Sequence, residues 1–215
     1  MITVIFVVML AIGYGIWSEE TSGTIVLFAP VYGTEMFVDG KLAGLSEEAG
    51  QKMSYNYSEG KHSVIVSHEG FWPWKKDLSL AAKTTITLKP FIVRKEVKPS
   101  EIPRSSYDAG TMTINQDYTD AMTKFNDLSI KEEFKKPLLS TGIGKARSVD
   151  YYPGRTDVLL VAVNNGIFAV ETGTTTPRNF EPVFEGKEPV FIKDDNNVLI
   201  IKDGDSLYRL FGFEK

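Results

Sequence analysis

Hydrophobic and polar positions divide the chain into stretches of different pattern, and the first stretch is the most uniform. Residues 2–17 are apolar apart from Thr3 and contain no charged side chain, and an acidic stretch begins directly after Trp17. As an α-helix, residues 2–17 would be about 24 Å long, slightly less than a hydrocarbon core of about 30 Å. An aromatic residue at the end of such a run is typical of the membrane interface. The pattern therefore predicts a transmembrane anchor at residues 1–18.

Two other interpretations of this stretch are open. A cleaved signal peptide would use a small-residue step at 11–13 or 13–15, but no Lys or Arg precedes the apolar run. A buried core helix would need neighbouring helices to cover every face, and the following residues predict none. The uncleaved anchor is favoured. Because the C-terminal flank is acidic, we expect a single-pass protein of the cell membrane with an extracytoplasmic C-terminal body.

From residue 23 to residue 93 the pattern alternates with a period of two. Runs rich in β-branched residues, each bounded by Gly, Pro or Asp, predict about six short strands. The clearest predicted strands are residues 24–28, 35–38, 62–68 and 84–88. Asp39-Gly40 is a strong hairpin signal, because both central residues of a type I′ turn need positive φ. The region 23–93 is therefore predicted to be a small antiparallel β-sandwich.

The same region resembles the PEGA domain. The matching motifs, in order along the chain, are Pro-Val-Tyr-Gly-Thr at 30–34, Met-Phe-Val-Asp-Gly-Lys-Leu-Ala-Gly at 36–44, Glu-Gly-Lys-His at 59–62 and Glu-Gly-Phe at 69–71. The chain departs from the family pattern at Thr34, where Ala is usual, and at Leu45-Ser46, where Thr-Pro is common. The resemblance implies a β-sandwich module of prokaryotic cell-envelope and surface proteins, in a family without accepted catalytic residues.

A connector follows at residues 94–137. It begins as a proline-containing extended linker, and apolar residues at helical spacing between 112 and 134 then predict one or two short helices.

Alternation returns in residues 138–215, where the chain repeats itself. Residues 157–170 align without gaps on residues 197–210, and in each copy an apolar run is followed by a polar turn and a second apolar run. Each copy predicts a β-hairpin, and a period near forty residues is that of a β-propeller blade. Two blades cannot close a ring of about four to eight. We therefore expect a propeller-blade-like antiparallel unit that covers its edges within the chain or pairs with further copies.

Composition narrows the function classes. The chain has 24 basic and 28 acidic residues, a net charge of −4 and no basic block, which argues against nucleic acid as a partner. It has no cysteine, so a disulfide scaffold, a thiol nucleophile and a cysteine zinc site are excluded.

Candidate chemistry is sparse. The aromatic and basic cluster of Trp72, Trp74, Lys75 and Lys76 is the one candidate interaction surface, for a protein partner or a cell-wall glycan, with core packing as the alternative. The two histidines, His62 and His68, are expected to be turn and strand-face residues. The acidic stretches at 194–197 and 203–205 lack the ligand order of a calcium loop and suit tight turns. No metal or cofactor is predicted.

These observations favour a non-catalytic, membrane-anchored cell-envelope protein that displays interaction modules, with a structural, adhesive or wall-binding role. The alternative is a subunit of a larger envelope complex or filament, assembled through the N-terminal helix and the open β unit, with partners that include further copies of the chain. An enzyme such as a glycoside hydrolase would need two placed carboxylates, and the sequence singles out no pair.

Overall fold

The chain is described here from a computed structural model, and its residues form two units. The described residues are 21–106, 116–129, 146–173, 177–194 and 196–213. Among them, the first unit contains 21–69, 73–91 and Pro177, and the second contains the remaining residues. Each unit is considered by itself.

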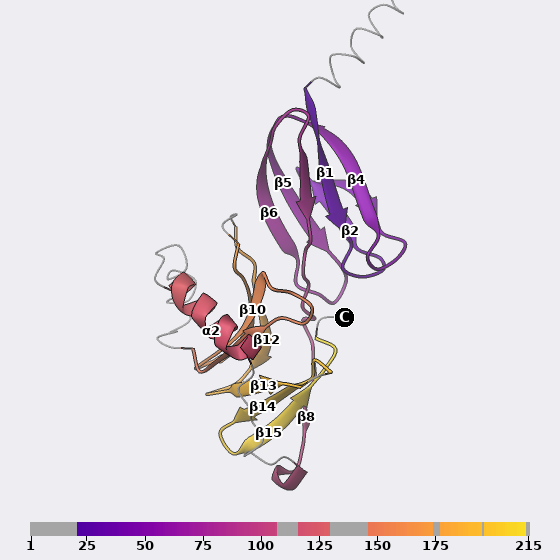
Figure 1. The fold of residues 1–215 in the computed structure, drawn as a ribbon. Coiled ribbons are helices and arrows are strands. Elements are labelled where there is room, and N and C mark those ends of the chain that lie inside the picture. The colour runs from indigo at the N-terminus through magenta and orange to yellow at the C-terminus, as the bar shows by residue number, and fades with distance from the viewer. Residues whose placement is uncertain (1–20, 107–115, 130–145, 174–176, 195, 214–215) are drawn as a thin grey trace, which may run out of the picture. The chain divides into compact units, whose positions relative to one another are not determined.

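The first unit consists of two β-sheets (Figure 1). One sheet has the order β4-β1-β7 and the other has the order β3-β2-β5-β6. The strands are β1 (Ser22–Phe28), β2 (Glu35–Val38), β3 (Lys41–Leu45), β4 (Lys52–Ser58), β5 (Gly60–Ser67), β6 (Trp74–Leu80) and β7 (Thr85–Leu88). One pair departs from the predicted antiparallel arrangement, since β1 runs parallel to β7 while it runs antiparallel to β4.

Alternating apolar residues of both sheets form the core of this unit. Met36 and Val38 of β2, and Val64 and Val66 of β5, are at most 2 % exposed, while the residues between them are only partly buried. A strand places successive side chains on opposite faces, so this alternation gives each sheet one buried face. Two such faces can be covered only by each other, which is the physical reason for a sandwich.

The second unit contains two four-stranded antiparallel sheets (Figure 1). The first has the order β12-β11-β10-β9 and the second has the order β13-β14-β15-β8. The strands are β8 (Ser100–Glu101), β9 (Ser148–Tyr151), β10 (Val158–Val163), β11 (Gly166–Glu171), β12 (Phe180–Glu185), β13 (Val190–Lys193), β14 (Leu199–Asp203) and β15 (Ser206–Leu210). Each sheet therefore has the four-strand size of a propeller blade.

The forty-residue repeat corresponds to two hairpins with the same register. In the first hairpin Leu159 pairs with Val170, and in the second Leu199 pairs with Leu210, which is the same pair moved by forty residues. Both hairpins also close across a two-residue turn, between Val163 and Gly166 in β10–β11 and at the corresponding place in β14–β15.

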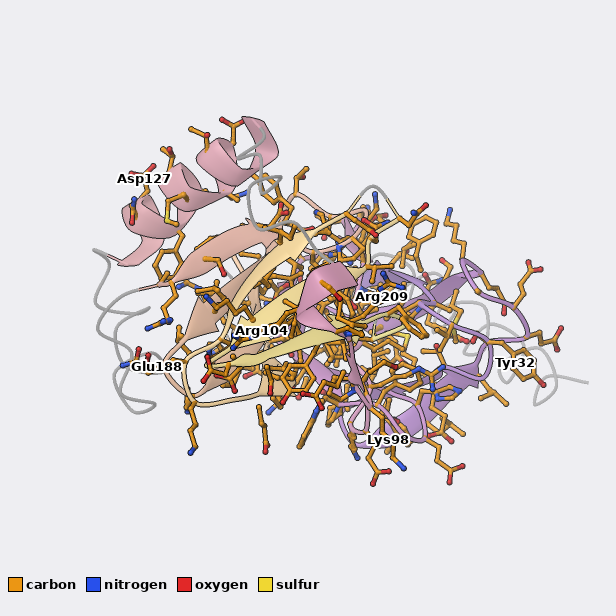
Figure 2. All side chains as sticks on the ribbon, turned by 90° about the horizontal axis from the view of Figure 1, so that it is seen from below. Tyr32, Lys98, Arg104, Asp127, Glu188 and Arg209 are labelled. Carbon is orange, nitrogen blue, oxygen red and sulfur yellow. The ribbon has the colours of Figure 1, made fainter. Side chains whose placement is uncertain are left out.

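Two elements from the predicted linker complete the second unit. β8 pairs with β15 and supplies the fourth strand of the second sheet, with Ile102 N–H donating to Leu207 O at 2.9 Å. The helix α2 (Gln116–Ser129) packs against the first sheet, where Ala121 and Phe125 join a buried cluster with Val149 and Val161. Asp127 points away from that sheet (Figure 2). The two sheets contact each other through the edge strands β9 and β13, where Ser148 Oγ of β9 accepts a hydrogen bond from Phe191 N–H of β13 at 3.0 Å.

The predicted transmembrane anchor and membrane localisation require correction. Residues 2–17 lie outside the described residues, and none of the helices that are described is long and apolar enough to cross a membrane. Helix α2 has 14 residues, about 21 Å of length, and carries Asp120, Lys124 and Asp127. The fold class is accordingly mainly β with several small antiparallel sheets, and the predicted single-pass cell-membrane localisation with an extracytoplasmic body is not maintained.

Candidate functional site

The four predicted interaction residues do not share one exposed surface. Trp74 and Lys76 are each 3 % exposed, because they lie two residues apart on the buried face of β6. Lys76 Nζ donates to Pro177 O at 3.1 Å and lies 5.7 Å from the centre of the Trp74 ring. Lys75 is exposed on the opposite face, with its Nζ 3.8 Å from Asp77 Oδ1. Trp72 precedes β6 and belongs to the second unit.

A hydrogen-bonded clasp joins two turns of the first unit. His62 Nδ1 lies 2.7 Å from Asp39 Oδ2, and His62 Nε2 lies 2.8 Å from Ser58 O. Both partners can only accept hydrogen bonds, so both bonds form together only when the two ring nitrogens of His62 carry protons and the imidazole is cationic. The second carboxylate oxygen of Asp39 accepts from Ser63 N–H at 2.9 Å.

The electrostatics of the clasp agree with this assignment. Burial lowers the pKa of His62, but the hydrogen bonds to Asp39 and Ser58 and the nearby negative charge outweigh burial, so the pKa lies above its usual value. The hydrogen bond from His62 holds the pKa of Asp39 below its usual value. With both nitrogens occupied, this histidine has no free lone pair with which to act as a general base.

The contact between Asp39 and His62 was missed by reasoning from the sequence. Asp39 was assigned to the turn alone, and its φ of +51° beside Gly40 at +76° agrees with a turn that needs positive φ. The sequence did carry a signal for this contact. The Asp-Gly-Lys and Gly-x-His motifs of the PEGA-like pattern contain Asp39 and His62. Asp39 and His62 lie close together because β2 and β5 are neighbouring strands in which Val38 pairs with Val64.

An apolar row crosses the outer face of the sheet β3-β2-β5-β6. Leu42 pairs with Phe37, Phe37 pairs with Ile65, and Ile65 pairs with Lys75, so these four side chains lie on one face. Leu42 is 59 % exposed, and so is Leu45 near the other end of β3. The strand β3 is the edge of its sheet.

The loop before β2 adds a third exposed apolar side chain near this edge. Tyr32 is 70 % exposed and extends outward from its loop (Figure 2). Gly33 N–H donates to Ser46 O at 3.0 Å, which places the loop beside the end of β3. Three of the four exposed large apolar side chains among the described residues therefore lie between residues 32 and 45, and the fourth is Phe211.

The second unit has a groove of about 420 Å³ between β12 and the connector that leads to β8. Its apolar lining consists of Trp72, Val97, Pro99, Pro182, Val183 and Phe184. Four charged residues, Lys95, Glu96, Lys98 and Glu185, also line it. The Trp72 Nε1–H is buried and has no hydrogen-bond partner among the described residues, a state that costs about 1–3 kcal/mol.

The acidic stretches that were considered for calcium are turns where the structure describes them. Asp194 Oδ1 accepts hydrogen bonds from Asn196 N–H and Val198 N–H at 2.9 and 2.8 Å. Asp203 accepts hydrogen bonds from Lys187 N–H with Oδ2 and from Glu188 N–H with Oδ1. Within the described ranges, no three His, Cys, Asp or Glu side chains are grouped to hold a metal ion.

Comparison with known proteins identifies no relative. No protein-family model matches the chain, and no curated protein matches its sequence.

Proposed function

We propose that the chain is a non-catalytic interaction protein that self-associates through β3 and the outer face of its sheet. The observation that carries this proposal is the apolar row of exposed Leu42 and half-buried Phe37 and Ile65, together with exposed Leu45, at the edge of the first unit. Soluble monomers rarely leave contiguous apolar surface exposed unless a partner covers it. The PEGA-like motifs support a module without catalytic chemistry. Membrane attachment is not part of the proposal.

A second copy of the chain is the partner that suits β3 best. In a two-fold symmetric pair, each copy presents the same strand in the opposite direction. Placing the axis between Ala43 and Gly44 sets Leu42 of one copy against Leu45 of the other, and the reverse contact forms at the same time. The two most exposed leucines then cover each other.

Charge at the two ends of β3 favours the same arrangement. Lys41 begins the strand and Glu47 follows it, and neither side chain forms an ion pair within the described residues. In the antiparallel arrangement Lys41 of one copy faces Ser46 of the other, one residue before Glu47. Each Lys41 therefore lies near the Glu47 of the other copy, close enough for two long-side-chain attractions of opposite charge per dimer, and a parallel arrangement would instead oppose like charges.

The pairing of the two β3 strands is expected to stay short and not to continue as a regular ladder. The register between β2 and β3 shifts at Met36 and Phe37, which leaves Ala43 without a partner in β2. A bulge of this kind twists an edge strand and disfavours regular edge-to-edge pairing. The association should therefore be a discrete dimer and not an extended sheet.

Analytical ultracentrifugation of the full chain over a range of concentrations tests the proposal. We expect a monomer–dimer equilibrium in which Leu42→Asp weakens association by at least about tenfold, since it buries a charge in the apolar contact. Phe211→Asp is the matched control, because Phe211 is 60 % exposed but lies in the second unit, and it should leave the equilibrium unchanged.

A charge exchange tests the orientation. Lys41→Glu or Glu47→Lys alone should weaken the dimer by about fivefold, from two surface pairs of roughly 0.5 kcal/mol each. The double variant Lys41→Glu/Glu47→Lys should recover the wild-type constant. A chain that stays monomeric at all concentrations, or whose association ignores Leu42→Asp, contradicts the proposal.

A further inference from the structure

A second binding site lies in the other unit and does not depend on β3. We propose that the groove formed by Trp72, Val97, Pro99, Pro182 and Phe184 binds a proline-rich peptide in the extended polyproline II conformation. The groove volume of about 420 Å³ lies within the range of about 300–1,000 Å³ that is usual for ligand sites. All of its lining residues belong to the second unit.

The indole of Trp72 provides the main recognition group. Its Nε1–H is a buried donor without a partner, although the residue lines the groove. Because the nitrogen itself is covered, a carbonyl oxygen of a ligand can reach it only after the side chains above it move aside. Trp74 has a buried indole N–H as well, but that ring is 3 % exposed in the core of the first unit and lines neither groove wall.

The backbone around Trp72 is held in place, so the site is preorganised. Trp72 N–H donates to Val93 O at 2.9 Å, and Lys95 N–H donates to Gly70 O at 2.9 Å. Phe71 and Arg94 form an isolated antiparallel β-bridge between these two hydrogen bonds. Trp72 is thereby tied to the beginning of the connector that forms the opposite side of the groove.

The walls of the groove indicate why the peptide should be proline-rich. β12 is the edge of its sheet, so an added strand is the first arrangement to consider. However, Pro182 lies within β12 and Pro99 lies in the opposite wall, and neither residue has an N–H to donate to a ladder. A peptide held here needs carbonyl oxygens for the indole and apolar rings for the walls. A polyproline II segment offers both and forms no internal hydrogen bonds of its own.

The charges of the groove point to a neutral peptide. Lys95 and Lys98 are balanced by Glu96 and Glu185, and all four side chains are exposed. Lys98 extends outward from the connector (Figure 2). The Lys95 ammonium group lies 5.6 Å from the centre of the Trp72 ring, so it occupies the face on which a proline ring would stack. Binding has to displace this flexible side chain.

Two measurements with a ten-residue polyproline peptide test the proposal on the full chain. In NMR titrations the indole N–H signal of Trp72, assigned with Trp72→Phe, should move downfield, while the Trp74 signal stays in place. In fluorescence anisotropy with the labelled peptide, Trp72→Phe should weaken binding by about tenfold, because it keeps a ring and removes the donor.

The variant Lys95→Ala distinguishes a neutral ligand from an acidic one. Lys95→Ala should strengthen binding by about two- to fivefold, since the ring face is vacated, whereas an acidic ligand would lose affinity with the same change. Affinity should change less than twofold between 50 and 500 mM salt because the lining charges cancel. Lys75→Ala, an exposed lysine outside the groove, is the control and should bind as the wild type does.

Three results would overturn the proposal. The first is that none of the indole N–H signals of the wild-type chain moves at millimolar peptide, a result that needs no assignment and holds even where Trp72→Phe fails to fold. The second is wild-type affinity in a folded Trp72→Phe chain. The third is tighter binding of a proline-free extended peptide of the same length, which would indicate strand addition at β12. Leu42→Asp should leave peptide binding unchanged, so failure of the dimer and failure of the groove are distinguishable.

Discussion

Gly166 marks a structural difference between the two copies of the forty-residue repeat. It opens β11, and the equivalent position forty residues later, at the start of β15, is Ser206. A Cβ at Gly166 would stand 2.5 Å from the backbone oxygen of Phe184. The register between β11 and β12 is irregular next to this point, and that irregularity brings the carbonyl close. In the second copy the neighbouring strand is β8, whose pairing with β15 is limited to Tyr208 and Arg209 and leaves Ser206 outside it, so this position tolerates a side chain.

We expect Gly166→Ser to lower the free energy of unfolding by about 1–3 kcal/mol, since backbone atoms have to move to admit the side chain. The reciprocal change Ser206→Gly should cost about 1 kcal/mol or less, mostly through the entropy of the unfolded chain. Urea unfolding of both variants measures the difference. Equal losses of stability in the two variants would contradict a close contact that is specific to Gly166.

The clasp between His62 and Asp39 predicts a pH dependence of stability. The pKa of His62 is raised in the folded state, so its contribution is fully present below the unfolded value of about 6.5 and is lost as pH rises through the folded value. The pKa of Asp39 is lowered, so its contribution is present above about 4 and is lost in more acidic solution. The clasp is therefore strongest between these limits.

His62→Gln should lower the free energy of unfolding by on the order of 1 kcal/mol at pH 5 and by less at pH 8.5, because the contribution of the His62 charge is lost as pH rises through its folded pKa. The expected change in the free energy of unfolding is small because Asp39 is 47 % exposed and solvent screens its attraction to His62. Urea titrations of wild type and variant at both pH values provide the measurement. A loss of stability that is independent of pH would show that His62 acts only by packing.

Helix α2 is the element that gives the first sheet of the second unit a buried face. Val149, Leu159, Val161, Val163 and Val170 of that sheet form one buried cluster with Ala121 and Phe125 of the helix. The helix is short and has a polar outer face, so packing rather than intrinsic propensity should account for most of its stability.

Phe125→Ala should destabilise the chain by about 3–5 kcal/mol, since it removes a side chain that is 5 % exposed from this cluster. Asp127→Ala, on the exposed side of the same helix, should change stability by no more than about 0.5 kcal/mol. Thermal unfolding of both variants compares them. Similar small effects would mean that the helix does not close the core of the sheet.

The proposed dimer makes a prediction for the assembled protein in salt. The pairs of Lys41 with Glu47 are exposed, so raising the ionic strength from 0.05 to 0.5 M should screen them and weaken the dimer by a few-fold. The contact of Leu42 with Leu45 should persist, so dissociation should remain incomplete. Sedimentation equilibrium at both salt concentrations checks this. Strengthening of the dimer by salt would indicate that like charges face each other instead.

Local pattern was sufficient to place most strands. β2 lies where alternation predicts it, at residues 35–38, and β1 extends the predicted 24–28 by two residues at its start. The forty-residue offset also predicted both hairpins of the second unit, and the structure shows that they share one register. These features depend on side chains a few residues apart, and such neighbours are visible in a linear sequence.

Partners distant in the chain were not visible in the same way. β8 has two residues and no apolar pattern, yet it completes a sheet with β15 more than one hundred residues later. Trp74 and Lys76 share a face with two leucines, and the burial of a lysine on that apolar face depends on Pro177 O, about one hundred residues further along the chain. The clasp of His62 and Asp39 likewise depends on β2 and β5 being neighbours.

The amino-acid sequence by itself therefore determined the strand positions, the turns and the repeated hairpin, because each depends on local periodicity and on residues that tolerate positive φ. The tertiary structure alone decided which strands became neighbours, that Lys76 of β6 was buried, and where a partly exposed apolar row and a groove beside an unpartnered indole N–H remained. Those outcomes depend on packing between segments far apart in sequence. Hydrophobic burial is non-directional, so a local pattern does not specify which distant segment will cover an apolar face. The candidate sites are consequently properties of the fold, while the strands around them are properties of the sequence.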